Sequence, residues 1–373
     1  MVNKKGDEES GKKYFKFEPD YAVPPGETLR ETIEHLGMSQ TELARRTGRP
    51  IKTINEIVKG KAAITADTAL QLERVLNVPA GFWNNLERNY REALARLDER
   101  NRLEGQLEWL KQIPVNRMVK YGWIEDQKDK IDKLKSVLNF FGVASIDAWK
   151  DIWGKFLSGS KVAFRKSTAY ESETGALTVW IRQGQIEAKD ISCKPFDLYR
   201  FKRSLDIMKV LTKEPPEVFV PEMTALCANS GIAAVFTPEM PGCKVNGATY
   251  WASPEKAVIQ MSLRYKTDDH LWFTFFHEAG HILEHGKREV FIEYEGQKDK
   301  SEEEASFFAS EKLIPKSELQ NFITGGRFGS NAVMAFADRL GIAPGIVVGR
   351  LQHDGIIPFS HLNGLKRRFK WSN

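Results

Sequence analysis

The pattern that most constrains this chain is H-E-x-x-H, from His277 to His281, inside an apolar run with helical periodicity. Apolar and small residues recur there at steps of three and four: Phe273, Phe276, Ala279, Gly280 and Leu283. On a helix the two histidines lie one turn apart on one face, so both imidazoles can reach one metal ion. Glu278 lies about 100° around the helix from His277, which leaves it free to act as a general base on water.

The alternative is a core helix that carries two histidines without binding metal. The apolar residues before the pattern and the small residues inside it favour a zinc site over this alternative. Two other histidines lie nearby: His285 extends the same helical face by one turn, and His270 precedes the pattern. We expect His285 to end the helix beside Gly286 and His270 to occupy a surface turn, with neither acting as a ligand.

Length and composition describe a soluble globular chain. The 373 residues suffice for two or three domains, and 41% hydrophobic with 28% charged residues is typical of globular proteins. A net charge of +5 permits contact with nucleic acid without requiring it. The sequence contains no apolar run approaching about 18 residues and no signal-peptide pattern. Three widely spaced cysteines predict a reducing cytoplasm and buried thiols: Cys193, Cys227 and Cys243.

The amino-terminal quarter predicts a tail followed by a small helical bundle. Residues 1–23 contain many charged and few apolar residues, so we expect a flexible tail. Within residues 24–92, Ser39 is followed three residues later by Glu42, which is the capping-box pattern of a helix start. A short turn at Gly48 then leads to another short helix. Two short helices joined by such a turn, inside a bundle, are typical of a helix-turn-helix.

This segment also resembles a known family. The phrases GMSQTELARRTG and GKAAITADTALQLERVLNVPAGFW are similar to the Cro/C1-type (XRE) helix-turn-helix of HigA-type antitoxins. The resemblance implies binding to double-stranded operator DNA through five residues: Gln40, Ile51, Lys52, Asn55 and Lys59. Gln40 would brace the backbone, the next three would face base edges, and Lys59 would lie near phosphate. Pro50 and Ile51 depart from the family pattern, because Ile51 can offer only apolar contact. The alternative is a helical module that docks proteins and not DNA.

The centre of the chain predicts helices followed by a small sheet. Residues 93–215 have a charged pattern with apolar residues at helical steps, so we expect packed helices. After a further helix, three short β-branched runs follow: 232–236, 249–251 and 257–261. We expect these runs to form a sheet against the His277 helix. The third run would be an edge strand able to pair with an extended polypeptide.

A third metal ligand must come from another segment, because no third histidine follows His281 at the usual short spacing. The acidic helix that begins near Ser301 is the obvious source. Its inner side is defined by Ala305, Phe308, Ala309 and Lys312. Glu303 points away from that side, whereas Glu302 and Glu304 flank it. Periodicity leaves both of these carboxylates open as the third ligand.

A second resemblance favours one of these two glutamates as the third ligand. FTFFHEAGHILEH followed by EEEASFFASEKLIP is similar to the ImmA/IrrE metallopeptidases, in which the glutamate before the alanine is the third ligand. The resemblance implies that His277, His281 and Glu304 hold Zn²⁺, with Glu302 as second choice, and that Glu278 is the catalytic base. It also implies a regulatory protein as substrate, such as a repressor or a toxin–antitoxin component.

These patterns predict an α+β chain that is mostly α. Its parts are a flexible tail (1–23), a five-helix Cro/C1-type helix-turn-helix domain (24–92), a helical middle region (93–215), a zincin-like domain with a small sheet packed on the H-E-x-x-H helix (216–320) and a helical tail (321–373). The predicted function is a cytoplasmic transcriptional regulator fused to a zinc-dependent endopeptidase. The alternative is an antitoxin-like repressor that binds DNA and a partner protein without proteolysis. Expected partners are operator DNA, a protein substrate or toxin and a second copy of the chain in a homodimer, but no membrane.

Overall fold

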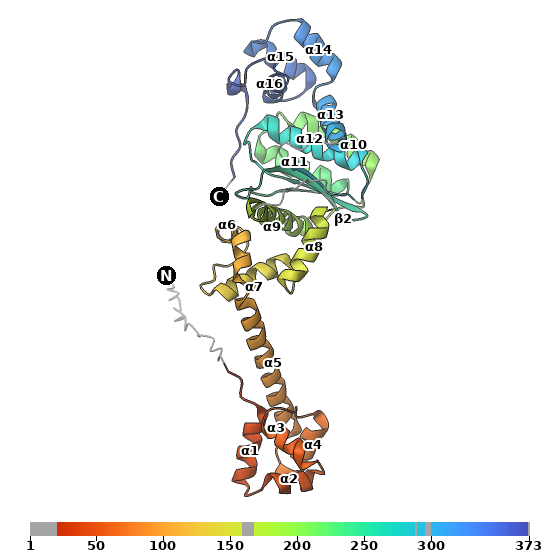
Figure 1. Ribbon diagram of the computed structural model, residues 1–373. Helices are drawn as coiled ribbons and strands as arrows, with labels where there is room; N and C mark the ends of the chain where they lie inside the picture. Colours follow the sequence, from red (N-terminus) through yellow and green to blue (C-terminus); the bar gives the residue numbers. More distant parts are fainter. Residues whose placement is uncertain (1–20, 159–167, 288, 295–299, 372–373) are drawn as a thin grey trace, which may run out of the picture. The chain divides into compact units, whose positions relative to one another are not determined.

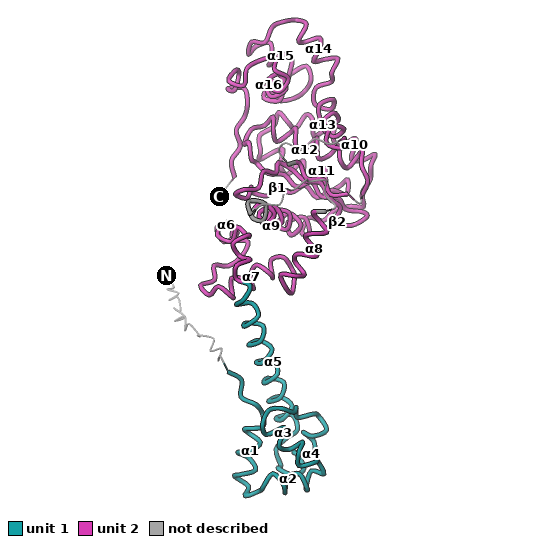
Figure 2. The backbone as a smooth tube through the Cα atoms, in the orientation of Figure 1, with its two compact units in different colours: residues 1–106 teal, residues 107–373 magenta. Residues whose placement is uncertain are grey.

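The computed structural model of the protein describes residues 21–158, 168–287, 289–294 and 300–371. The chain forms two compact units, residues 1–106 and residues 107–373 (Figure 2). Most of the described chain is helical, and one four-stranded sheet lies in the second unit (Figure 1). The predicted α+β class with mostly α structure is therefore confirmed. The predicted tail lies outside the described residues as far as residue 20.

Five helices form the first unit: α1 (Pro25–His35), α2 (Gln40–Thr47), α3 (Ile51–Val58), α4 (Ala66–Leu76) and α5 (Ala80–Glu104). Their apolar faces share one buried core, which includes Leu29, Leu43, Ile54, Leu72 and Trp83. Ser39 caps α2, because its Oγ accepts a hydrogen bond from the Glu42 amide at 3.1 Å. The Glu42 carboxylate pairs with Arg45 and Arg46, so it does not complete the reciprocal half of the predicted capping box.

The second unit begins with helices: η1 (Leu107–Gln112), α6 (Val115–Lys120), α7 (Lys130–Phe141), α8 (Ile146–Ser158), α9 (Thr168–Asp190) and α10 (Leu198–Leu211). Buried aromatic rings hold the first of these together. Phe141 packs edge-to-face against Trp149 and Trp153, with ring centroids 5.8 and 5.5 Å apart, and Trp109 packs on Trp149 at 5.2 Å. Aromatic pairs of this geometry stabilise a core beyond their buried area, so this charged stretch folds into packed helices.

The sheet follows α11 (Pro216–Asn229) and contains β1 (Ile232–Phe236), β2 (Val245–Ser253), β3 (Lys256–Met261) and β4 (Phe291–Tyr294). Its strand order is β1-β3-β2-β4, with β1 parallel to β3 and the other pairs antiparallel. The prediction that residues 257–261 form an edge was wrong, because β3 lies between β1 and β2. Residues 257–261 are all buried, as expected of a central strand.

The helix α12 (Asp268–Glu284) lies at the centre of the second unit. It packs against β2 and β3 and against two later helices, α13 (Lys300–Leu313) and α16 (Pro344–His353) (Figure 1). Between these, α14 (Lys316–Thr324) and α15 (Ser330–Leu340) extend the same apolar core. In the described part of the chain, no single helix is long and apolar enough to cross a membrane. The pair α15 and α16 meets that test together, with a bend of 111° between the two helices.

The carboxy-terminal segment after η2 (Asn363–Leu365) returns to the start of α12. The Asp268 amide donates to the carbonyl of Arg367 at 3.0 Å, and the Phe369 amide donates to the carbonyl of Lys266 at 2.8 Å. The Lys366 ammonium pairs with the Asp269 carboxylate at 2.6 Å, and both side chains are largely buried. This segment therefore fixes the amino-terminal turn of the helix that carries H-E-x-x-H.

Candidate metal centre and DNA-reading helix

The two histidines of H-E-x-x-H lie together on α12. His277 is 2% exposed and His281 is 1% exposed, and their Nε2 atoms are 3.0 Å apart. The separation arises from helix geometry, since residues at i and i+4 share a face. The predicted pairing of the two imidazoles is present in the structure.

The carboxylate that meets these imidazoles belongs to Glu302. Its Oε2 lies 3.0 Å from Nε2 of His277, and its Oε1 lies 3.4 Å from Nε2 of His281. Glu304, which the resemblance implied as third ligand, lies elsewhere: it pairs with His285 at 3.1 Å and with Lys300 at 3.4 Å. The implied set with Glu304 therefore needs correction, because the inner face of α13 presents Glu302 and not Glu304 to the two histidines.

The geometry of this cluster fits a tetrahedral ion. Ligand atoms bound to zinc at about 2.0–2.1 Å with tetrahedral angles lie about 3.3 Å from one another. Here the two Nε2 atoms are 3.0 Å apart, and the nearest Glu302 oxygens lie 3.0 Å (Oε2) from Nε2 of His277 and 3.4 Å (Oε1) from Nε2 of His281. Within the described residues, His277, His281 and Glu302 form the group of buried side chains that could hold a metal ion. Two imidazoles and one carboxylate are also one of the donor sets found in catalytic zinc sites.

Neighbouring side chains contact the outer nitrogens of the two rings. The Ser306 hydroxyl lies 3.2 Å from Nδ1 of His277, and Nδ1 of His285 lies 3.1 Å from Nδ1 of His281. The Phe291 ring stacks on His281 with centroids 4.2 Å apart. Such partners fix the orientation of metal-binding imidazoles. Sequence reasoning missed the part of Ser306, although its position four residues after Glu302 places both on one helical face.

Glu278 is fully buried beside the cluster. Its Oε2 accepts a 2.6 Å hydrogen bond from the hydroxyl of Thr249 on β2, while Oε1 is buried without a hydrogen-bond partner among the described residues. A Cβ atom at Gly247 would lie 2.5 Å from Oε1, so only glycine leaves room for this carboxylate. Burial raises the pKa of Glu278 well above its usual value.

The side chains of Glu302, His277 and His281 shift one another's pKa values. Burial alone would raise the pKa of Glu302, but its hydrogen bonds to His277 and His281 outweigh that effect and lower the pKa to about 2. Burial alone would lower the pKa of His277, but the Glu302 hydrogen bond and nearby carboxylates raise it to about 9. Burial lowers the pKa of His281 to about 4. Because metal ligands must be deprotonated, binding of a cation by this cluster would release the proton shared between His277 and Glu302.

In the first unit, α3 has one buried and one exposed face. Ile54 and Ile57 lie in the core, whereas Ile51 is 42% exposed and the Lys52 side chain is 84% exposed. Four of the predicted contact residues lie along or just after this helix, and the fifth, Gln40, is the first residue of α2. Asn55 is half-buried and Lys59 is exposed. The exposed face of α3 can therefore enter a groove of DNA while its other face remains in the core.

Comparison with known proteins identifies the family to which the first unit is similar. Residues 29–83 match the helix-turn-helix family model. Virulence-associated protein I of Dichelobacter nodosus is 38% identical over 81 residues, which cover 21% of this chain and 75% of that protein. The chain belongs to the helix-turn-helix family. Residues 232–351 of this helix-turn-helix protein match the IrrE N-terminal-like domain of the M78 peptidase model. Both predicted resemblances are therefore confirmed.

Further relatives of the helix-turn-helix domain are small proteins. An uncharacterized HTH-type transcriptional regulator of Escherichia coli, YddM, is 32% identical and covers 17% of this chain and 67% of its own length. Among solved structures, an addiction module antidote protein of the HigA family from Coxiella burnetii is 33% identical, with coverage of 22% of this chain and 92% of its own and a TM-score of 0.21. The antitoxin HigA of Pseudomonas aeruginosa with the higBA promoter is 34% identical, with coverages of 23% and 94% and a TM-score of 0.22.

The IrrE N-terminal-like domain spans β1 through most of α16. It therefore contains the whole cluster of His277, His281 and Glu302, together with Glu278 and the two strands that pack around it. The helical region between residue 83 and residue 232 lies outside both family models.

Proposed function

We propose that this protein is a DNA-binding regulator whose second unit is a zinc-dependent endopeptidase. One observation carries the proposal: three buried ligand-type side chains converge at zinc-like spacing next to a buried carboxylate with an unpaired oxygen. The match to the IrrE N-terminal-like domain supports the same assignment. We assign the metal to His277, His281 and Glu302. The reducing cytoplasm expected from the cysteines is the proposed location.

Each of these residues would have a separate role in peptide hydrolysis. A zinc ion held by the cluster would supply Lewis-acid chemistry, which polarises a peptide carbonyl and makes water more acidic. Glu278 would accept the proton of the attacking water and pass it to the departing amine. The Thr249 hydroxyl holds one carboxylate oxygen of Glu278, which leaves the other oxygen for the proton. Ser306 and His285 orient the two imidazoles.

The sheet offers a place for an extended substrate. Among the described residues, β4 pairs with β2 on one side only and is the last strand in the order. Phe291 of β4 stacks on His281, so this edge runs beside the metal ligands. A peptide that adds to a sheet edge gains main-chain hydrogen bonds. We therefore propose that a protein substrate, such as a repressor or toxin–antitoxin component, binds along β4 and not along β3.

The test is the conservative substitution Glu278→Gln in the full-length protein. Gln keeps the shape and the Thr249 contact but cannot take a proton, so zinc content should stay the same while cleavage stops. Cleavage is measured by mapping new protein amino termini in cells that produce equal amounts of wild type or variant. Amino termini that depend on wild type alone support the endopeptidase. Identical sets of amino termini with full zinc loading would contradict it.

The second candidate function is an antitoxin-like repressor that binds DNA and a partner protein without proteolysis. The partial matches to small helix-turn-helix relatives favour this candidate. If the protein is such a repressor, Glu278→Gln would leave both repression and the level of every cellular protein unchanged. The unpaired buried oxygen of Glu278 argues for the enzyme, because burying such a group has a cost that a purely structural site need not carry.

DNA binding is proposed for the exposed face of α3. The helix-turn-helix match and the exposure of Ile51 and Lys52 support it. A gel shift on the DNA upstream of the protein's own gene, at several salt concentrations, tests the proposal. Lys52→Ala should weaken binding and reduce the salt dependence, whereas Lys189→Ala, an exposed lysine of the second unit, should change neither. No shift even at low salt would favour a protein-docking module instead.

A further inference from the structure

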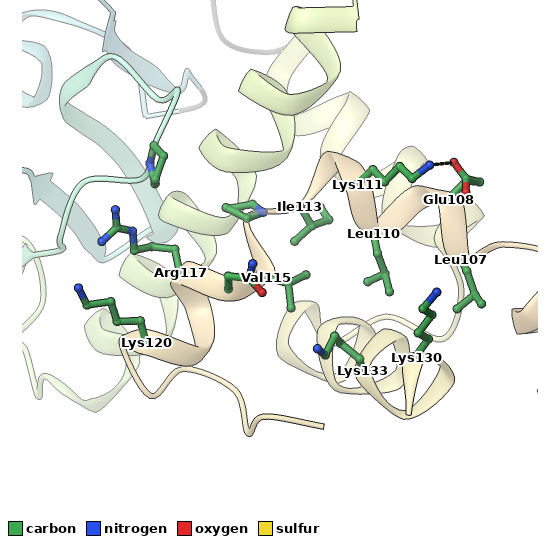
Figure 3. A pocket seen from close by; sticks show the side chains of 13 residues that line it. Leu107, Glu108, Leu110, Lys111, Ile113, Val115, Arg117, Lys120, Lys130 and Lys133 are labelled. Atoms are coloured by element: carbon green, nitrogen blue, oxygen red, sulfur yellow. Dashed lines mark ion pairs between the residues drawn. The ribbon is translucent and has the colours of Figure 1, made fainter. Parts of the chain in front are cut away.

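The second unit has another hollow, formed by residues far in sequence from the metal cluster. It is an open pocket of about 870 Å³ between η1, α6 and α7 (Figure 3). The residues that line it are Leu107, Glu108, Leu110, Lys111, Ile113, Pro114, Val115, Asn116, Arg117, Lys120, Lys130, Lys133 and Pro241. All but Pro241 belong to one continuous stretch that neither family model covers.

The rim of this pocket is strongly basic. Five cations and one carboxylate line it, so the formal charge of the lining is +4. The single lining carboxylate, Glu108, pairs with Lys111 at 2.5 Å, and Lys133 pairs with Asp126, outside the lining, at 3.7 Å. Lys120 and Lys130 are exposed, and within the described part of the chain no ion pair neutralises either of them. A concave surface with one sign of charge attracts ligands of the opposite charge.

The floor of the pocket is aliphatic. Ile113 and Val115 are buried, and Leu107 and Leu110 are half-buried beside them. Among the described residues that line the pocket, none is aromatic. Nucleic-acid bases bind to single-stranded readers by stacking on aromatic rings, so this floor fits aliphatic side chains better than bases.

The cations do not converge on one point. In Figure 3, Arg117 and Lys120 lie at one side of the view, Lys130 and Lys133 lie at the other with Leu110 beside them, and Val115 lies between the two groups. A single phosphate or carboxylate group is held by donors that meet around it. Charges spread along an apolar floor instead fit an extended ligand with several negative groups and apolar groups between them.

We propose that this pocket is a docking site for an acidic peptide segment of a partner protein, with aliphatic side chains between its carboxylates. The carboxylates face the lysines and the arginine of the rim, and the aliphatic side chains cover Leu107, Leu110 and the buried floor. Charge complementarity speeds the encounter and sets the register, while the apolar contacts slow dissociation. This site is separate from the proposed hydrolytic function and does not depend on it.

The experiment measures fluorescence anisotropy with the full-length protein. The probe is a fluorescein-labelled peptide of repeated Glu-Leu-Glu-Ala units, and a second probe replaces every Leu by Ser. The pocket variant is Lys120→Glu with Lys130→Glu, and the matched control is Lys150→Glu with Lys189→Glu, two exposed lysines outside the lining. Lys130 is the first residue of α7, where an acidic residue is compatible with the helix dipole, so folding should be retained.

The pocket variant should weaken binding of the leucine probe at least about tenfold, and the control less than about twofold. The serine probe should bind wild type more weakly than the leucine probe does. Equal loss in the pocket and control variants would overturn the proposal, since it would mean a general charge effect. Equal binding of both probes would overturn the role of the floor. Oligothymidylate that displaces the leucine probe completely from wild type, and whose own binding is lost in the pocket variant, would assign the site to nucleic acid instead.

Discussion

Gly280 of α12 faces the backbone of Ala305 of α13 at close range. A Cβ atom at Gly280 would lie 3.1 Å from Cα of Ala305 and 3.3 Å from its carbonyl oxygen. This close approach brings Glu302, one turn before Ala305, to the two histidines. The small residue inside H-E-x-x-H therefore has a geometric purpose: it sets the distance between the elements that supply the metal ligands.

The first prediction concerns this contact. Gly280→Val should push α13 away from α12 and lower zinc affinity at least about tenfold, because displaced ligands bind metal poorly. Gly154→Val is the matched control, since Gly154 lies in α8 and a Cβ atom there would meet nothing within 4 Å. Isothermal titration with zinc gives both affinities. Full affinity in Gly280→Val would show that the helix separation does not position Glu302.

The second prediction concerns Gly247. The added methyl group of Gly247→Ala would overlap the Glu278 carboxylate and Cγ2 of Thr274, so Glu278 must leave its place. The three metal ligands are not touched by this change. Zinc affinity should therefore stay within about threefold of wild type, while cleavage should fall by about the 10²-fold or more expected on losing a general base. A variant that still cleaves normally would remove Glu278 from the proposed reaction.

The third prediction concerns the carboxy-terminal segment. Lys366 and Asp269 form a largely buried ion pair, and removal of one partner leaves the other charge buried and unpaired. Lys366→Met should lower the free energy of unfolding by about 3–5 kcal/mol. Lys370→Met, at an exposed position of the same segment, should change it by less than about 0.5 kcal/mol. Urea unfolding followed by tryptophan fluorescence compares them, and equal midpoints would contradict this account.

The fourth prediction concerns pH. Burial raises the pKa of Asp268 from 3.8 to about 6, so the folded protein binds this proton more tightly than the unfolded chain does. The contribution of Asp268 to the free energy of unfolding should therefore fall by up to about 3 kcal/mol as pH rises from about 4 to 6, and level off above. Asp268→Asn should remove this dependence. Urea midpoints of wild type and Asp268→Asn, measured across this pH range, test the sign of the contribution. A wild-type midpoint that rises with pH, with the rise abolished by Asp268→Asn, would contradict the predicted sign.

The sequence predicted those parts of the molecule that depend on local pattern. The helix periodicity around His277, the cap at Ser39 and the helical spacing in the first unit depend on residues a few positions apart. The structure has them where they were expected. The pairing of the two histidines on one face of α12 follows from the same local geometry.

The parts that the sequence could not predict depend on contacts between distant elements. Glu302 and Glu304 both flank the apolar side of α13, and the choice between them depends on how α13 is rotated against Gly280 of α12. The central place of β3 depends on its parallel pairing with β1, which no local pattern specifies. Buried positions 302, 305, 309 and 313 of α13 give, in retrospect, the inner face that would have favoured Glu302.

The central claim is that His277, His281 and Glu302, and not Glu304, hold a zinc ion. Zinc titration of wild type, Glu302→Ala and Glu304→Ala in the full-length protein tests it most directly. The account predicts one zinc per chain in wild type and Glu304→Ala with affinities within about threefold, and an affinity at least about a hundredfold lower in Glu302→Ala. Retention of tight binding in Glu302→Ala together with its loss in Glu304→Ala would contradict it.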